Sequence, residues 1–98
     1  MRLISVEHLE DCFDGSAVFR YQTDEPWTTE RICALRQIGT LDYFPDFPRP
    51  FYRARTPQGL EIKGLQGERV CRVVLPKAGR ELLRQRWEEL LADSPDGP

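Results

Sequence analysis

The chain of 98 residues has little of what membrane and secreted proteins need. No apolar run reaches the roughly 20 residues of a membrane-spanning helix. The first residues lack the long apolar region and the small-residue cleavage site of a secretory signal. We therefore expect a cytoplasmic protein. The length suits one domain with a single core and is too short for two.

Catalytic and cofactor motifs are also missing. His8 is the only histidine, no serine stands in a nucleophile elbow, and no glycine-rich loop joins a strand to a helix. Hydrolase and nucleotide-binding classes therefore lack residues that could carry their chemistry. We expect a non-catalytic protein with no cofactor. An enzyme is the less favoured alternative, and it has no candidate nucleophile.

The three cysteines, Cys12, Cys33 and Cys71, are too few and too widely spaced for a disulfide framework. His8 and Cys12 stand four residues apart, so on a helix both could reach one metal ion. The other two cysteines would complete a site only if that helix lay over the core face of the sheet. Burial of Cys71 as a small apolar side chain is the simpler reading. We expect no metal, and the His8–Cys12 pair stays open.

The segment 51–75 predicts three antiparallel strands joined by two tight turns. The first turn, Thr56–Gly59, has the proline and glycine of a three-residue hairpin loop. It sets Thr56 opposite Leu60, and further along the strands it sets Arg53 opposite Lys63. This like-charge pair costs a few tenths of a kcal/mol unless something anionic lies between the two side chains.

The second turn is predicted at Gln66 and Gly67. Closing it as a two-residue turn sets Leu65 opposite Glu68, and it follows that Glu61 faces Arg72. The two turns together separate a core face from an outer face. The core face comprises Tyr52, Ala54, Leu60, Ile62, Cys71, Val73 and Leu75. The outer face comprises Phe51, Arg53, Arg55, Glu61, Lys63, Leu65, Glu68, Val70, Arg72 and Val74.

The outer face is the best candidate for a functional surface. In the predicted register Arg55, Glu61 and Arg72 form a row of alternating sign, which stabilises itself. A fully solvated face would not need its apolar members, so another element or another protein should cover part of it. These apolar members are Phe51, Leu65, Val70 and Val74.

Charge is segregated along the chain, although the net charge is only −2. Residues 1–48 hold four basic and nine acidic side chains, and residues 49–80 hold eight basic and two acidic ones. The simpler reading is attraction between helices and sheet across a polar rim. The alternative is an anionic partner on the sheet. Most of the basic residues are arginines, which is typical of a GC-rich bacterial coding sequence.

The segment 41–50 is rich in proline and aromatic residues. Its three prolines favour extended geometry in the residues before them. Its aromatic residues, Tyr43, Phe44 and Phe47, are expected to close one end of the core. The alternative is a protruding loop that docks another protein.

Four further elements are expected. The segment 5–13 predicts a short helix capped by Ser5, and the alternation over 16–23 predicts a strand at the edge of the sheet. The segment 27–38 predicts a helix with Arg31 toward solvent, and 79–92 predicts the clearest helix, with Leu83, Trp87, Leu90 and Leu91 buried. Residues 93–98 are expected to be a disordered tail after a single domain, 1–92.

The order helix, three strands, helix from Trp27 to Ala92 resembles that of double-stranded-RNA-binding domains. Those domains use lysines that open the last helix and a histidine in the first hairpin loop. The corresponding segments here read Lys77-Ala-Gly-Arg80 and Pro57-Gln-Gly59. The resemblance implies a nucleic-acid partner, but most of the residues that grip phosphate are replaced.

The sequence thus predicts an α+β domain: a two-layer sandwich with a three-strand meander, one N-terminal strand, and helices on one face. We expect a small non-catalytic binding or accessory module that acts on a protein partner or on a second copy of itself. The alternative is an anion or nucleic-acid binder that uses the basic side chains of the same face. No membrane partner is expected. The candidate partner-binding residues are Phe51, Arg53, Arg55, Lys63, Leu65, Val70, Arg72, Val74, Tyr43, Phe44 and Phe47.

Overall fold

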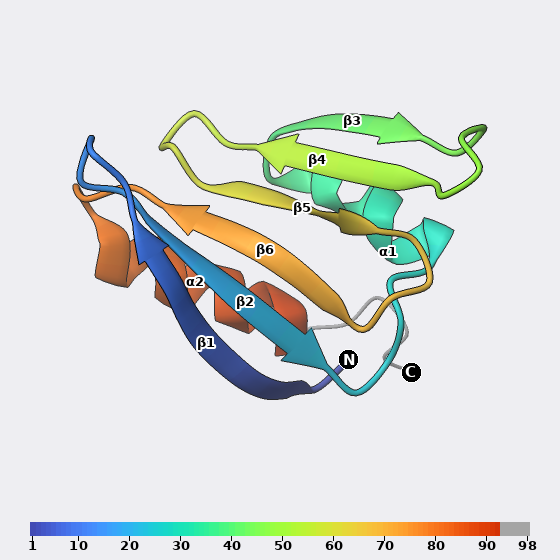
Figure 1. The fold of residues 1–98 in the computed structure, drawn as a ribbon, viewed down its shortest axis with the longest axis horizontal. Coiled ribbons are helices and arrows are strands. Elements are labelled where there is room, and N and C mark those ends of the chain that lie inside the picture. Colours follow the sequence, from blue (N-terminus) through green and yellow to red (C-terminus); the bar gives the residue numbers. More distant parts are fainter. Residues whose placement is uncertain (93–98) are drawn as a thin grey trace.

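The computed structural model describes residues 1–92, which form an α+β domain with one antiparallel sheet and two helices (Figure 1). The α+β class is therefore confirmed, but the sheet has six strands rather than four, in the order β1-β2-β6-β5-β4-β3. The predicted tail, 93–98, lies outside the described residues. The strands are β1 Leu3–Asp11, β2 Ala17–Thr23, β3 Thr40–Phe44, β4 Phe51–Arg55, β5 Glu61–Leu65 and β6 Val70–Leu75. The helices are α1 Thr29–Ala34, followed by the 3₁₀ turn η1 Leu35–Gln37, and α2 Arg80–Ala92.

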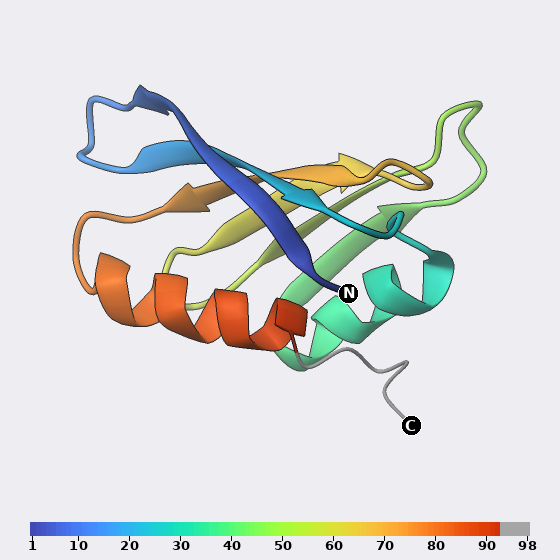
Figure 2. The same cartoon turned by 90° about the horizontal axis from the view of Figure 1, so that it is seen from below.

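Both helices lie on one face of the sheet (Figure 2). Between helices and sheet, Trp27 and Trp87 lie parallel with ring centroids 6.3 Å apart, and Tyr21 meets Trp87 edge-on. Within the described chain no helix covers the opposite face, which we call the outer face. The buried cluster comprises Tyr21, Trp27, Ile32, Leu35, Tyr52, Ala54, Leu60, Ile62, Cys71, Val73, Leu75, Trp87 and Leu91.

The first hairpin of the meander forms as predicted. Thr56 donates its backbone N–H to Leu60, and Gly59 adopts the left-handed φ of 100° that the loop requires. The β4–β5 register sets Arg53 opposite Lys63. Proline and glycine at fixed places in the loop were enough to fix this pairing.

The second hairpin differs from the prediction by two residues. Lys63 faces Arg72, and Glu61 faces Val74. The loop is wider than two residues because the segment before α1 engages its backbone. The Trp27 N–H donates to the Glu68 carbonyl, and the Trp27 carbonyl accepts from the Gly67 N–H at 2.9 Å. The Glu68 carbonyl, which a two-residue turn would pair with the Leu65 N–H, is thereby bonded to Trp27, while the Glu68 N–H still donates to the Leu65 carbonyl at 3.3 Å.

The two-residue shift preserves the faces, because side chains alternate with a period of two. Every residue assigned to the core face of the meander is buried. The row of alternating sign predicted from Arg55, Glu61 and Arg72 was wrong, however. Val74 occupies the place opposite Glu61, and Arg72 lies instead beside Lys63. The outer face therefore concentrates positive charge where an alternating row was expected.

The N-terminal helix predicted over 5–13 was wrong: residues 5–11 belong to strand β1, and residues 12 and 13 belong to the turn that follows it. It pairs with β2 across a turn in which Gly15 has a φ of 90° and Cys12 donates its N–H to the Ser16 carbonyl. Register irregularities on either side of Leu9 and near Ser5 interrupt the two-residue alternation. These bulges disguised the strand. Because β1 lies outside β2, the segment 16–23 is not at the sheet edge as expected.

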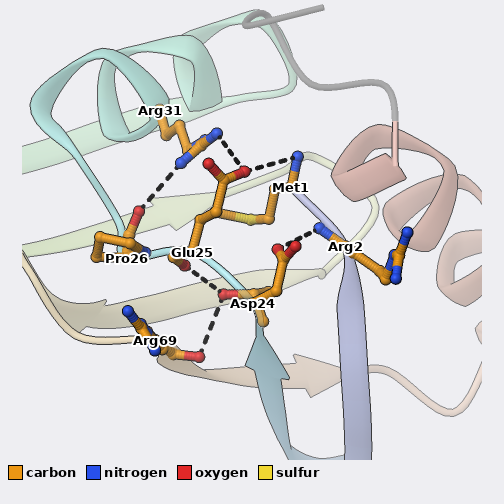
Figure 3. Close-up of polar contacts among 8 residues, drawn as sticks. Met1, Arg2, Asp24, Glu25, Pro26, Arg31 and Arg69 are labelled. Atoms are coloured by element: carbon orange, nitrogen blue, oxygen red, sulfur yellow. Dashed lines mark hydrogen bonds and ion pairs between the residues drawn. The ribbon is translucent and has the colours of Figure 1, made fainter.

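Helix α1 is shorter than the predicted 27–38, and its N-cap is Thr28, whose hydroxyl accepts from the Arg31 N–H. Arg31 was expected near solvent but is 5% exposed. Its guanidinium donates to Glu25 at 3.0 Å and to the Pro26 carbonyl at 3.3 Å, as Figure 3 shows. The Met1 amine lies 3.4 Å from the same Glu25 carboxylate. The arginine thus ties α1 to the segment that precedes it, and Glu25 links both to Met1.

The segment 41–50 is only partly the loop that was expected. Its first half belongs to strand β3, which pairs with β4 from Thr40–Arg55 to Phe44–Phe51. Four strands, β3 to β6, therefore separate α1 from α2, and β1 and β2 precede them. The predicted order of helix, three strands and helix was wrong, and with it the resemblance to double-stranded-RNA-binding domains.

Helix α2 forms close to the predicted bounds. Trp87 and Leu91 are buried, and Leu83 and Leu90 pack against the core from its margin. Glu88 accepts hydrogen bonds of 2.9 Å from the buried Tyr21 hydroxyl and from Arg84. This polar contact fixes the helix on the sheet.

Candidate binding face

The outer face carries four cations side by side on four adjacent strands. The pairings run Arg20–Arg72, Arg72–Lys63 and Lys63–Arg53, so the row crosses β2, β6, β5 and β4. All four side chains are exposed. We call them the cationic row. Neighbouring strands lie about 4.8 Å apart, so the row spans roughly 14 Å.

An acid closes each end of the cationic row. Glu7 on β1 faces Arg20, with 3.7 Å between carboxylate and guanidinium. Asp42 on β3 faces Arg53 and lies 3.5 Å from it. The pattern across the sheet is therefore one acid, four bases and one acid. The acids screen the ends of the row and leave its centre positive.

Arg72 is the least compensated member of the row. Its guanidinium has no ion-pair or hydrogen-bond partner among the described residues, whereas the Lys63 amine lies 3.9 Å from the Glu61 carboxylate. Its neighbours across the strands are both cations, Arg20 and Lys63. Like charges directly opposite one another in a sheet are destabilising. The centre of the row therefore costs stability within this chain.

A second row, of apolar side chains, runs beside the cationic row. Phe44 pairs with Phe51, Phe51 pairs with Leu65, and continuing the β5–β6 register sets Leu65 beside Val70. We call these four residues the apolar row. On β4, β5 and β6, which the two rows share, it lies two residues away along the strand, or about 6.7 Å. Phe44 is 41% exposed, and the other three are half-buried.

On the other side of the cationic row lie the remaining outer-face candidates. Arg55 faces Glu61, which faces Val74, and Val74 faces Val18 on β2. Arg55 also lies 3.5 Å from Asp42. Its charge is therefore compensated on both sides, and Val74 is half-buried, so this flank contributes less to any interaction.

The two rows line one hollow of about 700 Å³ on the outer face. In Figure 2 the β1–β2 turn and the β3–β4 loop both rise above the sheet on the side away from the helices. The outer face is therefore a trough. Its lining residues include Arg20, Arg53, Lys63, Arg72, Phe44, Phe51, Leu65, Val70 and Glu68.

The aromatic residues of 41–50 divide between the two faces. Phe44 stacks on Phe47 and on Phe51, and Phe47 meets Phe51 at a tilt of 51°, with ring centroids 4.6 to 5.6 Å apart. Tyr43 points to the core side, where its hydroxyl contacts Gln66 and Thr29. Phe44 and Phe51 line the trough, Phe47 packs against both of them, and Tyr43 belongs to the packing below the sheet.

The cysteines and His8 form no common site in the described part of the chain. The pairing of His8 with Cys12 assumed a helix, and the segment is a strand; His8 instead stacks on Phe19 and lies 2.9 Å from Asp11. Burial raises the pKa of the Cys71 thiol to about 12. Cys71 is therefore a protonated core residue.

Three residues of the face were not among the sequence candidates: Arg20, Glu7 and Asp42. Arg20 lies on a strand that was predicted, but the neighbour of that strand was unknown. Glu7 had been placed on a helix, and Asp42 in a loop. The signal in each case was strand alternation, which bulges hid in β1 and nearby prolines hid in β3.

No protein-family model, curated protein or solved structure matched the chain. None of the helices within residues 1–92 has the length and apolar character needed to cross a bilayer. The outer face must therefore be interpreted from its own geometry.

Proposed function

We propose that the protein is a small non-catalytic binding module that takes a protein partner on its outer face. The observation that carries the proposal is the cationic row, with Arg72 uncompensated at its centre. A row of like charges destabilises the free chain. A partner that brings carboxylates to it would gain the attraction that this chain leaves unused.

The apolar row supports a protein partner rather than a simple anion. Phe51, Leu65 and Val70 are half-buried in a trough that no other described element fills. Interfaces combine such apolar side chains with a polar margin, and arginine and phenylalanine are enriched in them. A partner with apolar side chains next to acidic ones would match both rows.

Self-association through this face is the weaker form of the proposal. A symmetric dimer would bring the same patch of each copy together. Arg72 and Lys63 lie near the middle of that patch, so the two cationic rows would meet near the dimer axis. Opposed like charges in a closed interface are costly.

The test compares three baits in cells that produce the chain: the wild type, Arg72→Glu and Arg36→Glu. Arg36 is exposed on η1, on the helix side of the domain, so its reversal changes the net charge equally. We expect a protein that the wild type and Arg36→Glu retain and Arg72→Glu loses. Identical sets of retained proteins with all three baits would refute the proposal.

A further inference from the structure

The geometry of the two rows also restricts the kind of segment that fits. This inference rests on the proposed function and deepens it. We infer that the outer face takes an amphipathic helix of the partner, laid across the strands, with a stripe of carboxylates beside a stripe of apolar side chains. The carboxylates would meet the cationic row, and the apolar stripe would meet the apolar row.

The spacing of the rows favours a helix over an extended chain. Each row offers one side chain per strand, about every 4.8 Å. A helix offers one side chain per turn on a given stripe, about every 5.4 Å, so over three intervals the two patterns drift apart by only about 2 Å. An extended segment in the same direction repeats on one side every 6.7 Å or so, and its drift reaches about 6 Å.

The width of a helix also matches the distance between the two rows. The rows are about 6.7 Å apart along the strands. A helix about 10 Å across covers both rows at once, and adjacent stripes on its surface can carry different chemistry. The long side chains of Arg53, Lys63 and Arg72 can absorb the remaining mismatch.

The acids at the ends of the cationic row argue against a long polyanion. A nucleic-acid backbone that followed the row would pass over Glu7 at one end and Asp42 at the other. Each passage would bring a phosphate toward a carboxylate, which costs binding energy. A helix of about three turns ends its acidic stripe where the row ends, so it meets the four bases without the flanking acids.

The test uses two synthetic peptides of about four helical turns. The in-phase peptide places glutamates beside a leucine stripe, and the control peptide of the same composition places them on the face opposite the leucines. A third probe is a single-stranded oligothymidylate. Binding of each to the wild type, Lys63→Glu and Arg36→Glu is measured by fluorescence anisotropy.

We expect the in-phase peptide to bind the wild type at least tenfold more tightly than the control peptide. Lys63→Glu should remove this preference, and Arg36→Glu should keep it. Equal binding of both peptides would overturn the helix inference and leave an acidic partner on the outer face intact. Tighter binding of oligothymidylate that Lys63→Glu abolishes would make the partner a nucleic acid. No binding of any probe would overturn the helix inference, and the bait comparison would then decide the proposed function separately.

Discussion

At the scale of single residues, the core contains a close approach between Tyr52 and Gly64. A Cβ on Gly64 would lie 2.7 Å from the Tyr52 hydroxyl oxygen and 3.1 Å from the ring carbon that bears it. This hydroxyl is buried and has no hydrogen-bond partner within residues 1–92. The glycine therefore makes room for the tyrosine ring.

We expect Gly64→Ala to lower the free energy of unfolding by about 1–3 kcal/mol, because the strand has no space for the methyl group. Tyr52→Phe should be neutral or should stabilise by up to about 1 kcal/mol, because it removes an unsatisfied buried hydroxyl. In the double variant the cost of Gly64→Ala should fall by at least roughly 0.5 kcal/mol. Urea unfolding of the four proteins measures the coupling, and strictly additive effects would contradict the described contact.

Cys71 should make the fold sensitive to alkaline pH. Burial raises the pKa of its thiol from 9.0 to about 12, so the unfolded chain ionises first as pH rises. The contribution of the protonated thiol to the free energy of unfolding is therefore complete below pH 9 and is lost between pH 9 and about 12.

We expect the free energy of unfolding to fall in both proteins when the pH is raised from 8 to 10.5. The fall should be about 2 kcal/mol smaller in Cys71→Val than in the wild type, because the variant has no buried thiol. Tyr21, whose pKa burial also raises, contributes equally to both proteins above pH 10. Tryptophan fluorescence in urea at the two pH values provides the comparison. Equal losses in the two proteins would mean that the thiol at position 71 is not buried as described.

At the scale of elements, the pairing of β2, β6 and β5 assembles the cationic row. Arg72 stands between Arg20 and Lys63, and each of these two contacts opposes folding. We expect Arg72→Glu to raise the free energy of unfolding by about 0.5–1 kcal/mol at low salt, because it replaces two repulsions by two attractions.

The matched control is Arg36→Glu, which changes the net charge equally on the helix side and should leave unfolding nearly unchanged. The gain of Arg72→Glu should shrink as salt screens the row. A loss of stability in Arg72→Glu at low salt would show that the row does not oppose folding.

The same elements show what the sequence could and could not predict. The first hairpin and α2 were predicted because local chemistry decides them: Pro57 and Gly59 in the loop, and the apolar stripe ending at Leu91. The second hairpin was missed by two residues because Trp27, far away in sequence, engages its loop. Strand β1 was missed because bulges broke its alternation.

The sequence predicted which side chains lie on the outer face, but not the order in which they follow one another across the strands. Alternation placed Lys63, Leu65 and Arg72 on the outer side, and an error of two residues could not change that. The order of charges along a row depends on register, and register depended on the distant contact with Trp27. The continuous cationic row therefore became visible only when all six strands were placed.

At the scale of the whole molecule, the domain has one face covered by helices and one face open (Figures 1 and 2). If the open face served self-association, the cationic row of one copy would have to meet the cationic row of the other. We expect the protein to sediment as a monomer at low salt and high concentration, because the centre of the row repels its copy. A stable dimer that Arg72→Glu dissociates would contradict this expectation and would make a second copy the partner.

The central claim is that the outer face, and not the helix side, is the binding surface. The most direct test is a map of backbone amide chemical shifts in ¹⁵N-labelled protein as the captured partner, or the in-phase peptide, is added. We expect the changes to concentrate on β2, β6, β5 and β4 around Arg20, Arg72, Lys63 and Phe51. Changes confined to the hollow between Ile38 and Leu90 on the helix side would contradict the account.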